Sequence, residues 1–361
     1  MSIQSPDVCI VGAGVMGLLS ALELADAGLT VRLFDRGQAA QESSWAGGGI
    51  ISPLYPWRYP PSITALATFS QLVYPEIIAR VRESSGIDPQ FMRHGMLVTA
   101  MAERADALAW GAAQGGAVQT LSMAEAQRLE PYATVHEPPL WMPQIASVRT
   151  PRLGRALRET VRQHPRIRLS EHQVVTLSGT RDAPVVVIDH ETHQAGYVVV
   201  AAGAWTQAVL GTIGVSTPVR PMKGQMLLFA PSFRVGRVVL ADGRYAIPRA
   251  DGRIVFGSTL EDVGFQRCPD APAHASLYAS AIHLIPALAE VPIELQWSGF
   301  RPAAPGGIPW IGALSPRLWV NAGQYRNGVV LAPASARLLA DAILQRPPVV
   351  DPTPYQPRID A

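Results

Sequence analysis

Apolar and polar positions divide the chain into short buried strands and amphipathic helices. The apolar run DVCIV leads into GAGVMG, apolar residues then recur at helical spacing from Val15 to Ala25, and a second apolar run, TVRLFD, ends at Asp35. This order predicts a strand, a helix and a parallel strand, that is, a βαβ unit. Further short apolar runs at 197–202 and 317–324 are typical of strands covered on both faces of a parallel sheet. We therefore expect one sheet assembled from distant segments.

A different pattern fills the middle of the chain. Residues 237–259 hold two Asp-Gly pairs, at 242–243 and 251–252, and each pair is flanked by β-rich runs. Asp-Gly between such runs is a strong hairpin signal, so an antiparallel meander is predicted. Further β-rich runs lie at 95–100, 224–230 and 294–302. Together they predict a second lobe built around an antiparallel sheet.

The last apolar pattern predicts a helix that starts close behind Gly328. Ala332, Ala336 and Leu339 recur at helical spacing there. Pro333 is expected in the first turn, where proline is tolerated because the first amides have no partner within the helix.

Composition narrows the function classes. The 361 residues are 48% hydrophobic and 16% charged, which is enough apolar material for a large core and two lobes. The net charge of +2 is scattered, so neither nucleic acid nor a membrane surface is an expected partner. The start of the chain lacks the features of a leader, and no apolar run is long enough to span a membrane, so we expect a cytoplasmic protein. Cys9 and Cys268 have no metal-ligand spacing, so no metal site is predicted.

The glycines after the first strand fit a dinucleotide fingerprint. Gly12, Gly14 and Gly17 would provide a tight turn, a close approach to a pyrophosphate and close helix packing. Asp35 follows about 20 residues further on, where a carboxylate accepts hydrogen bonds from the ribose and disfavours a 2′-phosphate. Glycines also open many helices for steric reasons, but the strand before and the acid behind favour the dinucleotide.

A second glycine-rich stretch, ESSWAGGGIISP, follows directly. Ser43 and Ser44 offer hydroxyl groups, and Gly47, Gly48 and Gly49 expose consecutive backbone amides. A flexible glycine loop is the simpler interpretation. The apolar residues on both sides instead indicate a buried loop, whose amides need a partner.

Six stretches, in chain order, resemble the D-amino-acid oxidase family of flavoproteins, and most closely its glycine oxidase branch. They are VGAGVMG…LFDR, SSWAGGG, VVVAAGAWT, PMKGQ, GFRPAAPGGIPWIG and GQYRNGVVLAP, and they cover essentially the whole chain. The resemblance implies noncovalent FAD, a substrate that is a small amine or amino acid bearing a carboxylate, and reoxidation by dioxygen to hydrogen peroxide. The family more often carries Glu at the position of Asp35, although the shorter acid can still reach a ribose. In many bacteria the glycine oxidase branch supplies an imine for thiamine thiazole formation.

The fold class implied by these patterns and the resemblance is α/β. A Rossmann-like FAD-binding domain would comprise residues 1–85, 145–220 and 300–361, and an α+β substrate-binding domain on an antiparallel sheet would comprise 86–144 and 221–299. The resemblance adds further cofactor-binding residues to those already named. They are Val15, Met16, Arg36, Val175, Gly203, Trp205, Gln324, Tyr325, Asn327, Gly328, Val329 and Val330.

Arg301 is the strongest candidate for binding a substrate carboxylate. Strand alternation puts it on one face with Trp297 and Gly299, while Phe300 points the other way. A structural Asp or Glu is the ordinary partner for an arginine, but no acid occurs from Arg301 to Trp310. The planar guanidinium matches a carboxylate bidentately. The resemblance assigns the same role to Arg301.

Arg326 and Tyr245 are the other candidate catalytic residues. Arg326 precedes the predicted helix, whose N-terminal amides are free. In the flavoproteins that the chain resembles, such amides stabilise the reduced, anionic flavin, and the resemblance therefore implies that Arg326 lies near the substrate. An arginine merely packed or solvated beside a turn is the alternative. Tyr245 is a packing residue by the simplest interpretation, whereas the resemblance implies a second hydrogen bond to the carboxylate. No histidine falls inside the motifs, and none is predicted to be catalytic.

These residues predict a hydride transfer mechanism, because the motifs contain no general base for removing an α-proton. The expected reaction is oxidative deamination of glycine, sarcosine or small D-amino acids to a 2-oxo acid, ammonia and hydrogen peroxide. One alternative is a D-amino-acid dehydrogenase that reduces a quinone, and another is a flavin-binding scaffold without turnover. A sarcosine oxidase with covalent flavin would need a cysteine near Arg301, and none is present. The sequence does not rank the substrates and leaves a homo-oligomer open.

Overall fold

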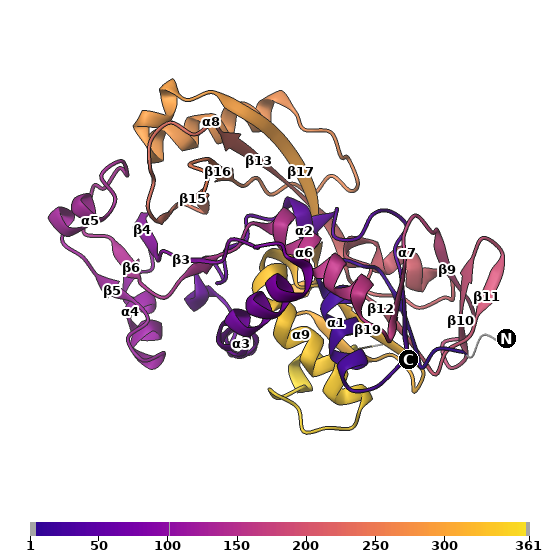
Figure 1. The fold of residues 1–361 in the computed structure, drawn as a ribbon. Coiled ribbons are helices and arrows are strands. Elements are labelled where there is room, and N and C mark those ends of the chain that lie inside the picture. The colour runs from indigo at the N-terminus through magenta and orange to yellow at the C-terminus, as the bar shows by residue number, and fades with distance from the viewer. Residues whose placement is uncertain (1–4, 101, 359–361) are drawn as a thin grey trace.

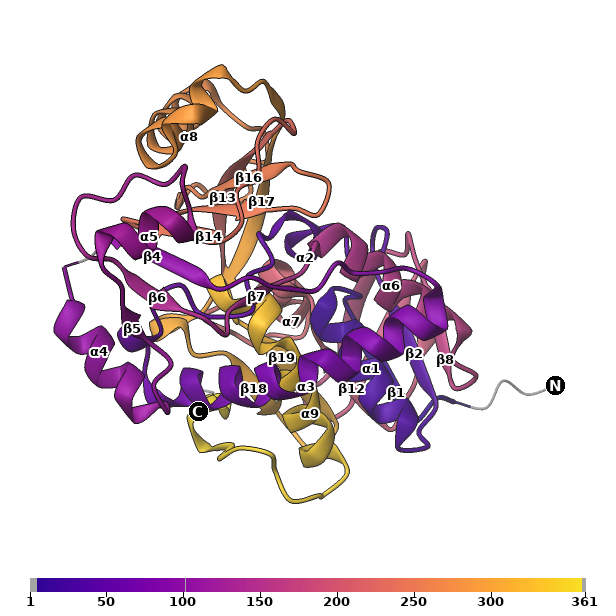
Figure 2. The same ribbon diagram turned by 60° about the vertical axis from the view of Figure 1, so that its left-hand side comes forward.

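Two large sheets dominate the computed structural model of the chain, which describes residues 5–100 and 102–358 (Figures 1 and 2). The first sheet has the strand order β18-β19-β12-β1-β2-β8. Its strands are β1 (Val8–Val11), β2 (Val31–Phe34), β8 (Ile167–Ser170), β12 (Tyr197–Val200), β18 (Trp310–Ala313) and β19 (Leu318–Ala322). All neighbours run parallel except β18, which is antiparallel to β19. The predicted βαβ unit and the two predicted distant strands, β12 and β19, are confirmed.

Both faces of this sheet are covered, as the continuous apolar runs predict. Val8 and Ile10 of β1 join one core, and Cys9 and Val11 join the other. The first core is formed with helices α1 (Val15–Asp26), α3 (Pro61–Ser85), α6 (Thr150–Gln163) and α9 (Gly328–Ile343), and Figure 2 shows α3 beside α9. Strands β9 (Val175–Gly179) and β10 (Pro184–Ile188) and helix α7 (Thr206–Gly211) contribute to the second core, and β11 (Glu191–His193) pairs with β10.

Helix α9 begins at Gly328, as predicted, but Pro333 lies in its second turn rather than its first. Proline cannot donate the hydrogen bond that the carbonyl of Val329 would otherwise accept. The hydroxyl of Tyr74 in α3 donates to that carbonyl instead, at 2.6 Å. The neighbouring helix thus satisfies the group that Pro333 leaves free, which is why the proline is tolerated further inside the helix than the sequence indicates.

The second sheet has the strand order β17-β13-β16-β15-β14-β4-β6-β5. Its strands are β4 (Met96–Ala100), β5 (Gln119–Thr120), β6 (Leu140–Met142), β13 (Arg220–Phe229), β14 (Val238–Ala241), β15 (Arg244–Pro248), β16 (Ile254–Gly257) and β17 (Ile293–Ala303). The predicted meander is confirmed, because the two Asp-Gly turns join β14 to β15 and β15 to β16. Asp242 and Gly243 both have positive φ, of 45° and 76°, as a tight hairpin turn requires.

One pair makes this sheet mixed rather than purely antiparallel. Strands β4 and β14 run parallel. The prediction of an antiparallel sheet is therefore wrong at this pair. The two strands are separated by the chain that builds much of the first lobe, so no hairpin determines their relative direction. Helices α4 (Arg104–Ala113) and α5 (Met123–Leu129) lie between β4 and β6, and α8 (Ala271–Leu284) covers one face of the sheet.

Strands β13 and β17 connect the two sheets. They pair along almost their whole lengths, and Figure 1 shows β17 running from the second sheet down towards the first. A bridge between Ala303 and Gln324 attaches the end of β17 to the segment before α9. The predicted domain boundary at 299/300 falls inside β17, so the boundaries stay a prediction. The short helix α2 (Ser43–Ala46) and the short pair β3 (Met92–Arg93) and β7 (Ala146–Ser147) complete the fold.

Candidate active site

Almost all the predicted site residues line one cavity. Tyr245, Arg301 and Arg326 line it. The predicted cofactor residues that line it are Gly12, Gly14, Val15, Met16, Asp35, Arg36, Ser43, Ser44, Gly47, Gly48, Gly49, Val175, Gly203, Trp205, Gln324, Tyr325, Asn327, Gly328, Val329 and Val330.

Gly17 is the one predicted cofactor residue that does not line the cavity. A Cβ added there would lie 1.8 Å from the carbonyl oxygen of Gly12. Its role is therefore the close packing of α1 against the preceding turn, the third of the reasons for glycine in this motif.

The N-terminus of α1 opens into the cavity with free amides. Gly14 is the N-cap residue and has no side-chain cap. The amide of Val15 donates to Ser44 Oγ at 2.9 Å, and the amide of Ala13 donates to Asp35 Oδ2 at 2.7 Å. The amides of Gly14 and Met16 have no acceptor among the described residues. Free amides at a helix N-terminus bind phosphate groups well.

Asp35 is half-buried, and its carboxylate already accepts two backbone hydrogen bonds. Besides Ala13, the amide of Gly37 donates to Oδ1 at 2.9 Å. Burial raises the pKa of Asp35, while these two amides lower it. Each carboxylate oxygen has a second lone pair. A ribose contact at Asp35 stays a prediction, now with two of its acceptor positions occupied by the chain itself.

The glycine loop after α2 is packed rather than flexible. Thr150 Oγ1 donates to the carbonyl of Gly47 at 2.7 Å. A Cβ on Gly48 would lie 2.7 Å from Ile247 Cδ1, and Gly49 has a φ of 84°. These close contacts argue against the alternative of a loose glycine loop, and they explain why the loop carries no side chains.

Six residues close a ring of contacts at one edge of the cavity and join the two lobes. Glu42 pairs with Arg36 at 3.2 Å and with Arg267 at 2.9 Å. Arg36 lies over the ring of Trp205, and Arg267 lies over the ring of Phe300, in two cation–π contacts. Phe265 contacts both of these aromatic rings and so completes the ring of contacts. Trp205 and Phe265 are stacked, with ring centroids 5.0 Å apart. Glu42 and Phe265 were not singled out from the sequence, because no local pattern marks them.

Arg301 reaches the cavity from β17 on the face that alternation predicts, together with Gly299. Its Nη2 donates to Ser258 Oγ at 2.7 Å, and its Nη1 donates to the carbonyl of Thr259 at 3.2 Å. No Asp or Glu among the described residues forms an ion pair with it. Burial lowers the pKa of Arg301, and the nearby charge of Arg326 lowers it further. The guanidinium is thus oriented by neutral groups and keeps its charge available for an anion.

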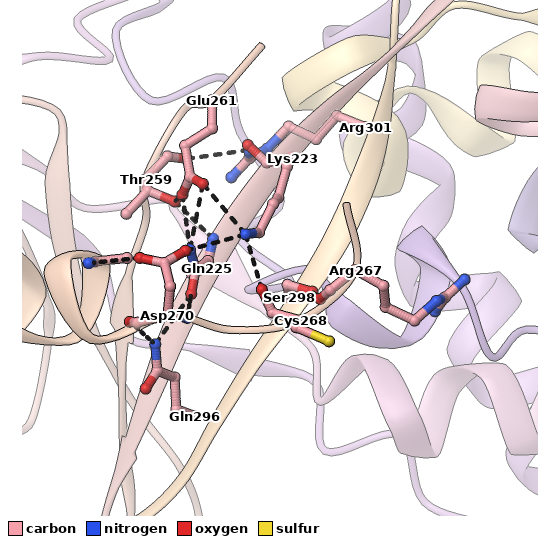
Figure 3. A network of polar contacts seen from close by, with 11 residues as sticks. Lys223, Gln225, Thr259, Glu261, Arg267, Cys268, Asp270, Gln296, Ser298 and Arg301 are labelled. Carbon is pink, nitrogen blue, oxygen red and sulfur yellow. Dashed lines mark hydrogen bonds and ion pairs between the residues drawn. The ribbon is translucent and has the colours of Figure 1, made fainter. Parts of the chain in front are cut away.

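A network of polar contacts behind β13 holds the segment that orients Arg301 (Figure 3). Lys223 Nζ is 3.3 Å from Glu261 Oε2 and 3.1 Å from Asp270 Oδ2. The hydroxyl of Thr259 donates to Glu261 and accepts from the amide of Gln225. Lys223 and Gln225 do not line the cavity, and their side chains belong to this network, so the lysine of the PMKGQ motif supports the site from behind instead of lining it.

Gly224 gives the same motif a direct role. It lies opposite Gly299 on the cavity face, and a Cβ added there would lie 2.0 Å from Arg301 Nη1. The guanidinium of Arg301 therefore occupies the space that a side chain at Gly224 would need. The motif contains this glycine, but its role could be recognised only from the register of β13 and β17.

We expect Gly224→Ala to weaken carboxylate binding without unfolding the protein, because the clash is with the far end of a flexible side chain. Displacing a charged hydrogen-bonding partner should cost about 2 kcal/mol, or roughly 30-fold in the Kd of acetate. Acetate titrations followed by the flavin spectrum measure this. Gly236→Ala is the control, because a Cβ there meets its nearest atom at 3.6 Å. An unchanged acetate Kd in Gly224→Ala would contradict the arrangement.

Arg326 lies at the cavity in the turn before α9 and is exposed. It forms no ion pair with the described residues. The amides of Gly328 and Val329 at the start of α9 have no acceptor among those residues, and the buried Nδ2 of Asn327 is also unpaired. These groups can together stabilise negative charge in the cavity.

Tyr245 stands on β15, is 7% exposed and lines the cavity. The hydroxyl of Tyr245 lies close to the guanidinium of Arg301 and raises its pKa. The structure thus places the tyrosine beside the arginine, as a shared carboxylate site needs. Ser258 was missed from the sequence, because a single serine after a strand carries no distinctive signal.

The described lining of the cavity contains two carboxylates, Asp35 and Glu42, and no histidine or lysine. Asp35 is bound to backbone amides, and Glu42 is paired with two arginines. Neither belongs to the group around Arg301. No cluster of three or more potential ligands that could hold a metal ion occurs among the described residues.

Comparison with known proteins identifies the family of this chain. The sequence model of a family described as FAD dependent oxidoreductase, or DAO, matches residues 7–342. The chain belongs to the DAO family. Its members are FAD-dependent, so FAD is the cofactor of this chain too. The family resemblance inferred from the sequence motifs is confirmed.

Individual relatives in the DAO family are similar over nearly the whole chain. A glycine oxidase of Pseudomonas aeruginosa is 45% identical, and the match covers 98% of this chain and 99% of that protein. The crystal structure of glycine oxidase from Geobacillus kaustophilus superposes with a TM-score of 0.91 at 28% identity, over 97% of this chain and 98% of that one. A bifunctional protein ThiO/ThiG of Trichormus variabilis is 30% identical over 94% of this chain and 53% of its own length.

The cavity fits the cofactor of the DAO family. Free amides at the N-terminus of α1 would hold the phosphates, and those of α9, with Asn327, would bind polar atoms of the flavin. Gly47, Gly48 and Gly49 line the cavity without side chains, which would leave room for the ring. Both cysteines lie away from the lining, since Cys9 is buried in β1 and Cys268 is exposed on a loop. FAD is therefore held without a covalent bond to cysteine.

Proposed function

We propose that the chain is an oxidase that oxidatively deaminates glycine and other small amines or amino acids, such as sarcosine and small D-amino acids. The products would be a 2-oxo acid (glyoxylate from glycine), ammonia and hydrogen peroxide. The observation that carries the proposal is Arg301, a guanidinium that faces the cavity of an FAD-dependent protein and has no acidic partner in the described chain. The 45% identity to a glycine oxidase supports the substrate class.

The residues around Arg301 would orient a small amino acid. The guanidinium binds the carboxylate, and the Tyr245 hydroxyl donates a second hydrogen bond to it. Gly224 and Gly299 contribute no side chains on this face, so the arginine determines where the carboxylate lies. A carboxylate held at two points fixes the α-carbon in one orientation, which is the main requirement for a rapid step between bound groups.

The absence of a base near Arg301 in the described lining supports hydride transfer over α-proton abstraction. The amine would lose its proton to solvent before reaction. When bound, FAD supplies the hydride acceptor and passes the electrons to dioxygen. Arg326 and the amides at the start of α9 would stabilise the negative charge that accompanies reduction, and water would then hydrolyse the imine product.

Anaerobic mixing tests the proposal against its two alternatives. Glycine, sarcosine and D-alanine are added separately to the FAD-loaded protein without oxygen, and the flavin absorbance is followed. We expect bleaching with at least one of them and, on adding oxygen, one hydrogen peroxide per 2-oxo acid. Bleaching without stoichiometric peroxide would favour a quinone-reducing dehydrogenase. An oxidised flavin with all three would favour a scaffold.

No helix in the described part of the chain is long and apolar enough to cross a membrane.

We further propose that the imine formed from glycine serves thiamine thiazole formation. The support is the similarity to a ThiO/ThiG protein, of which this chain matches about half. Detection of thiazole product when this oxidase is combined with a thiazole synthase would test it. The cytoplasmic location and the oligomeric state stay predictions.

A further inference from the structure

Arg249 is a buried cation without an acidic partner. It is 8% exposed and forms no ion pair with any Asp or Glu of the described residues. Its Nη1 donates to the carbonyl of Val148 at 3.1 Å, and its Nη2 donates to the carbonyl of Gly48 at 2.8 Å. A buried charge usually needs a counter-charge. Here only the dipoles of two peptide groups face the guanidinium directly.

The surroundings of Arg249 do not neutralise it. Burial, and then the charge of Arg149, lower the pKa of Arg249 to about 10, so it stays charged at neutral pH. The charge of Asp251 raises the pKa of Arg249, but Asp251 is itself paired with Arg149 at 2.7 Å and with Arg253 at 3.1 Å. Burial and nearby arginines lower the pKa of His94 to about 4, so this histidine is neutral.

The position of Arg249 links it to the cavity. Tyr245, Ile247 and Arg249 alternate along β15 and its end, and all three contact the loop at Gly48. A Cβ on Gly48 would lie 3.2 Å from Tyr245 Cε2 and 2.7 Å from Ile247 Cδ1, and the Gly48 carbonyl accepts from Arg249. One face of β15 therefore carries the proposed substrate tyrosine, a hydrophobic support for the glycine loop and the arginine that binds the loop.

The peptide group between Gly48 and Gly49 lies between the charge of Arg249 and the cavity. This peptide is trans, so its N–H points opposite to the carbonyl that binds Arg249. Gly48 and Gly49 both line the cavity, and the Gly49 amide has no acceptor among the described residues. A cation bound to the carbonyl of a peptide makes its N–H a stronger donor, because hydrogen-bonded dipoles polarise one another.

We propose that Arg249 is a positioning residue for the flavin. It fixes the loop at Gly48 and polarises the following peptide, so that the Gly49 amide and the buried charge behind it stabilise negative charge on the bound ring. This inference depends on FAD binding and goes beyond the identity of the amine. A buried charge such as that of Arg249 stabilises a nearby anion, and the size of this effect corresponds to roughly a tenfold change in the affinity for that anion.

The test compares Arg249→Gln, which can still donate to the carbonyls but is neutral, with Arg249→Lys, which keeps the charge. Sulfite adds reversibly to oxidised flavin and leaves negative charge on the ring, so its Kd reports this property without any amine substrate. We expect the Gln variant to bind sulfite at least roughly tenfold more weakly than the parent, with a two-electron potential lower by about 30 mV. The Lys variant should stay within about threefold of the parent.

Arg253→Gln is the matched control, because Arg253 lies on the same hairpin but is paired with Glu294 and Asp251 at the surface. Its sulfite Kd should equal that of the parent. Equal sulfite affinity in the parent and in Arg249→Gln would overturn the proposal and leave Arg249 a purely structural residue. Equal losses in the Gln and Lys variants would overturn it as well, since charge would not be the cause. If the Gln variant fails to bind FAD, the proposal requires that the Lys variant bind FAD and have a sulfite Kd that matches that of the parent.

Discussion

Arg301→Ala is expected to weaken the binding of small carboxylates by about 2–5 kcal/mol, or roughly 30- to 5,000-fold. The guanidinium is oriented by Ser258 and by the carbonyl of Thr259, and it has no acid partner within the described chain. Removing it would leave the carboxylate in a partly desolvated cavity without its counter-charge. Arg301→Lys should recover only part of the loss, because an ammonium cannot bind a carboxylate bidentately.

Acetate titrations and the KM for glycine measure this effect separately from flavin binding. The flavin spectrum of Arg301→Ala should stay close to that of the parent, since the predicted cofactor contacts lie elsewhere. Arg220→Ala is a suitable control, because Arg220 is on the neighbouring strand and pairs with Asp262 at the surface. A parental KM for glycine in Arg301→Ala would show that the carboxylate is bound by another group.

Gly12→Ala is expected to abolish stable FAD binding. Gly12 has a φ of 104°, and a Cβ there would lie 2.5 Å from the backbone oxygen of Ala201. Backbone atoms of a buried strand end cannot move aside as a flexible side chain can. The expected result is a loss of about 3 kcal/mol or more in the free energy of unfolding, together with an α1 N-terminus displaced from the phosphates.

Gly28→Ala provides a closely matched comparison in the same lobe. Gly28 has a φ of 99°, but a Cβ there would meet nothing within 4 Å. It therefore isolates the backbone strain, at about 1–3 kcal/mol, from the steric clash at Gly12. Thermal unfolding and FAD titration of both variants measure the difference. Equal FAD affinities would show that the close approach at Gly12 does not shape the phosphate site.

The site has an excess of positive charge, to which three arginines and two helix N-termini contribute. Arg301 and Arg249 are held by neutral oxygens, and Arg326 has no ion pair among the described residues. The amides at the start of α1 and α9 add partial positive charges at two further points. Phosphates, a reduced flavin and a substrate carboxylate are all anions, so one electrostatic arrangement serves the cofactor and the substrate together.

Much of the nucleotide site follows from residues close together in the sequence. Gly12, Gly14 and Asp35 belong to one βαβ unit, whose strands and helix are defined by local periodicity and whose turn requires a positive φ. The hairpin turn at Asp242 and Gly243 is likewise a local property. Such features are predictable because neighbours in the chain are necessarily neighbours in space. The parallel pairing of β4 with β14 was not predictable, because no short connection constrains it.

The sequence by itself predicted which residues would carry the chemistry: the glycine turn, the free amides before α9, and an arginine on a strand without a nearby acid. Only the tertiary structure decided what supports them. Ser258 reaches Arg301 through the register of β13, β16 and β17, and Arg249 reaches Gly48 because β15 packs against a loop from the other lobe. These contacts join residues far apart in the chain. Their existence depends on how sheets pair and pack, which local periodicity does not encode.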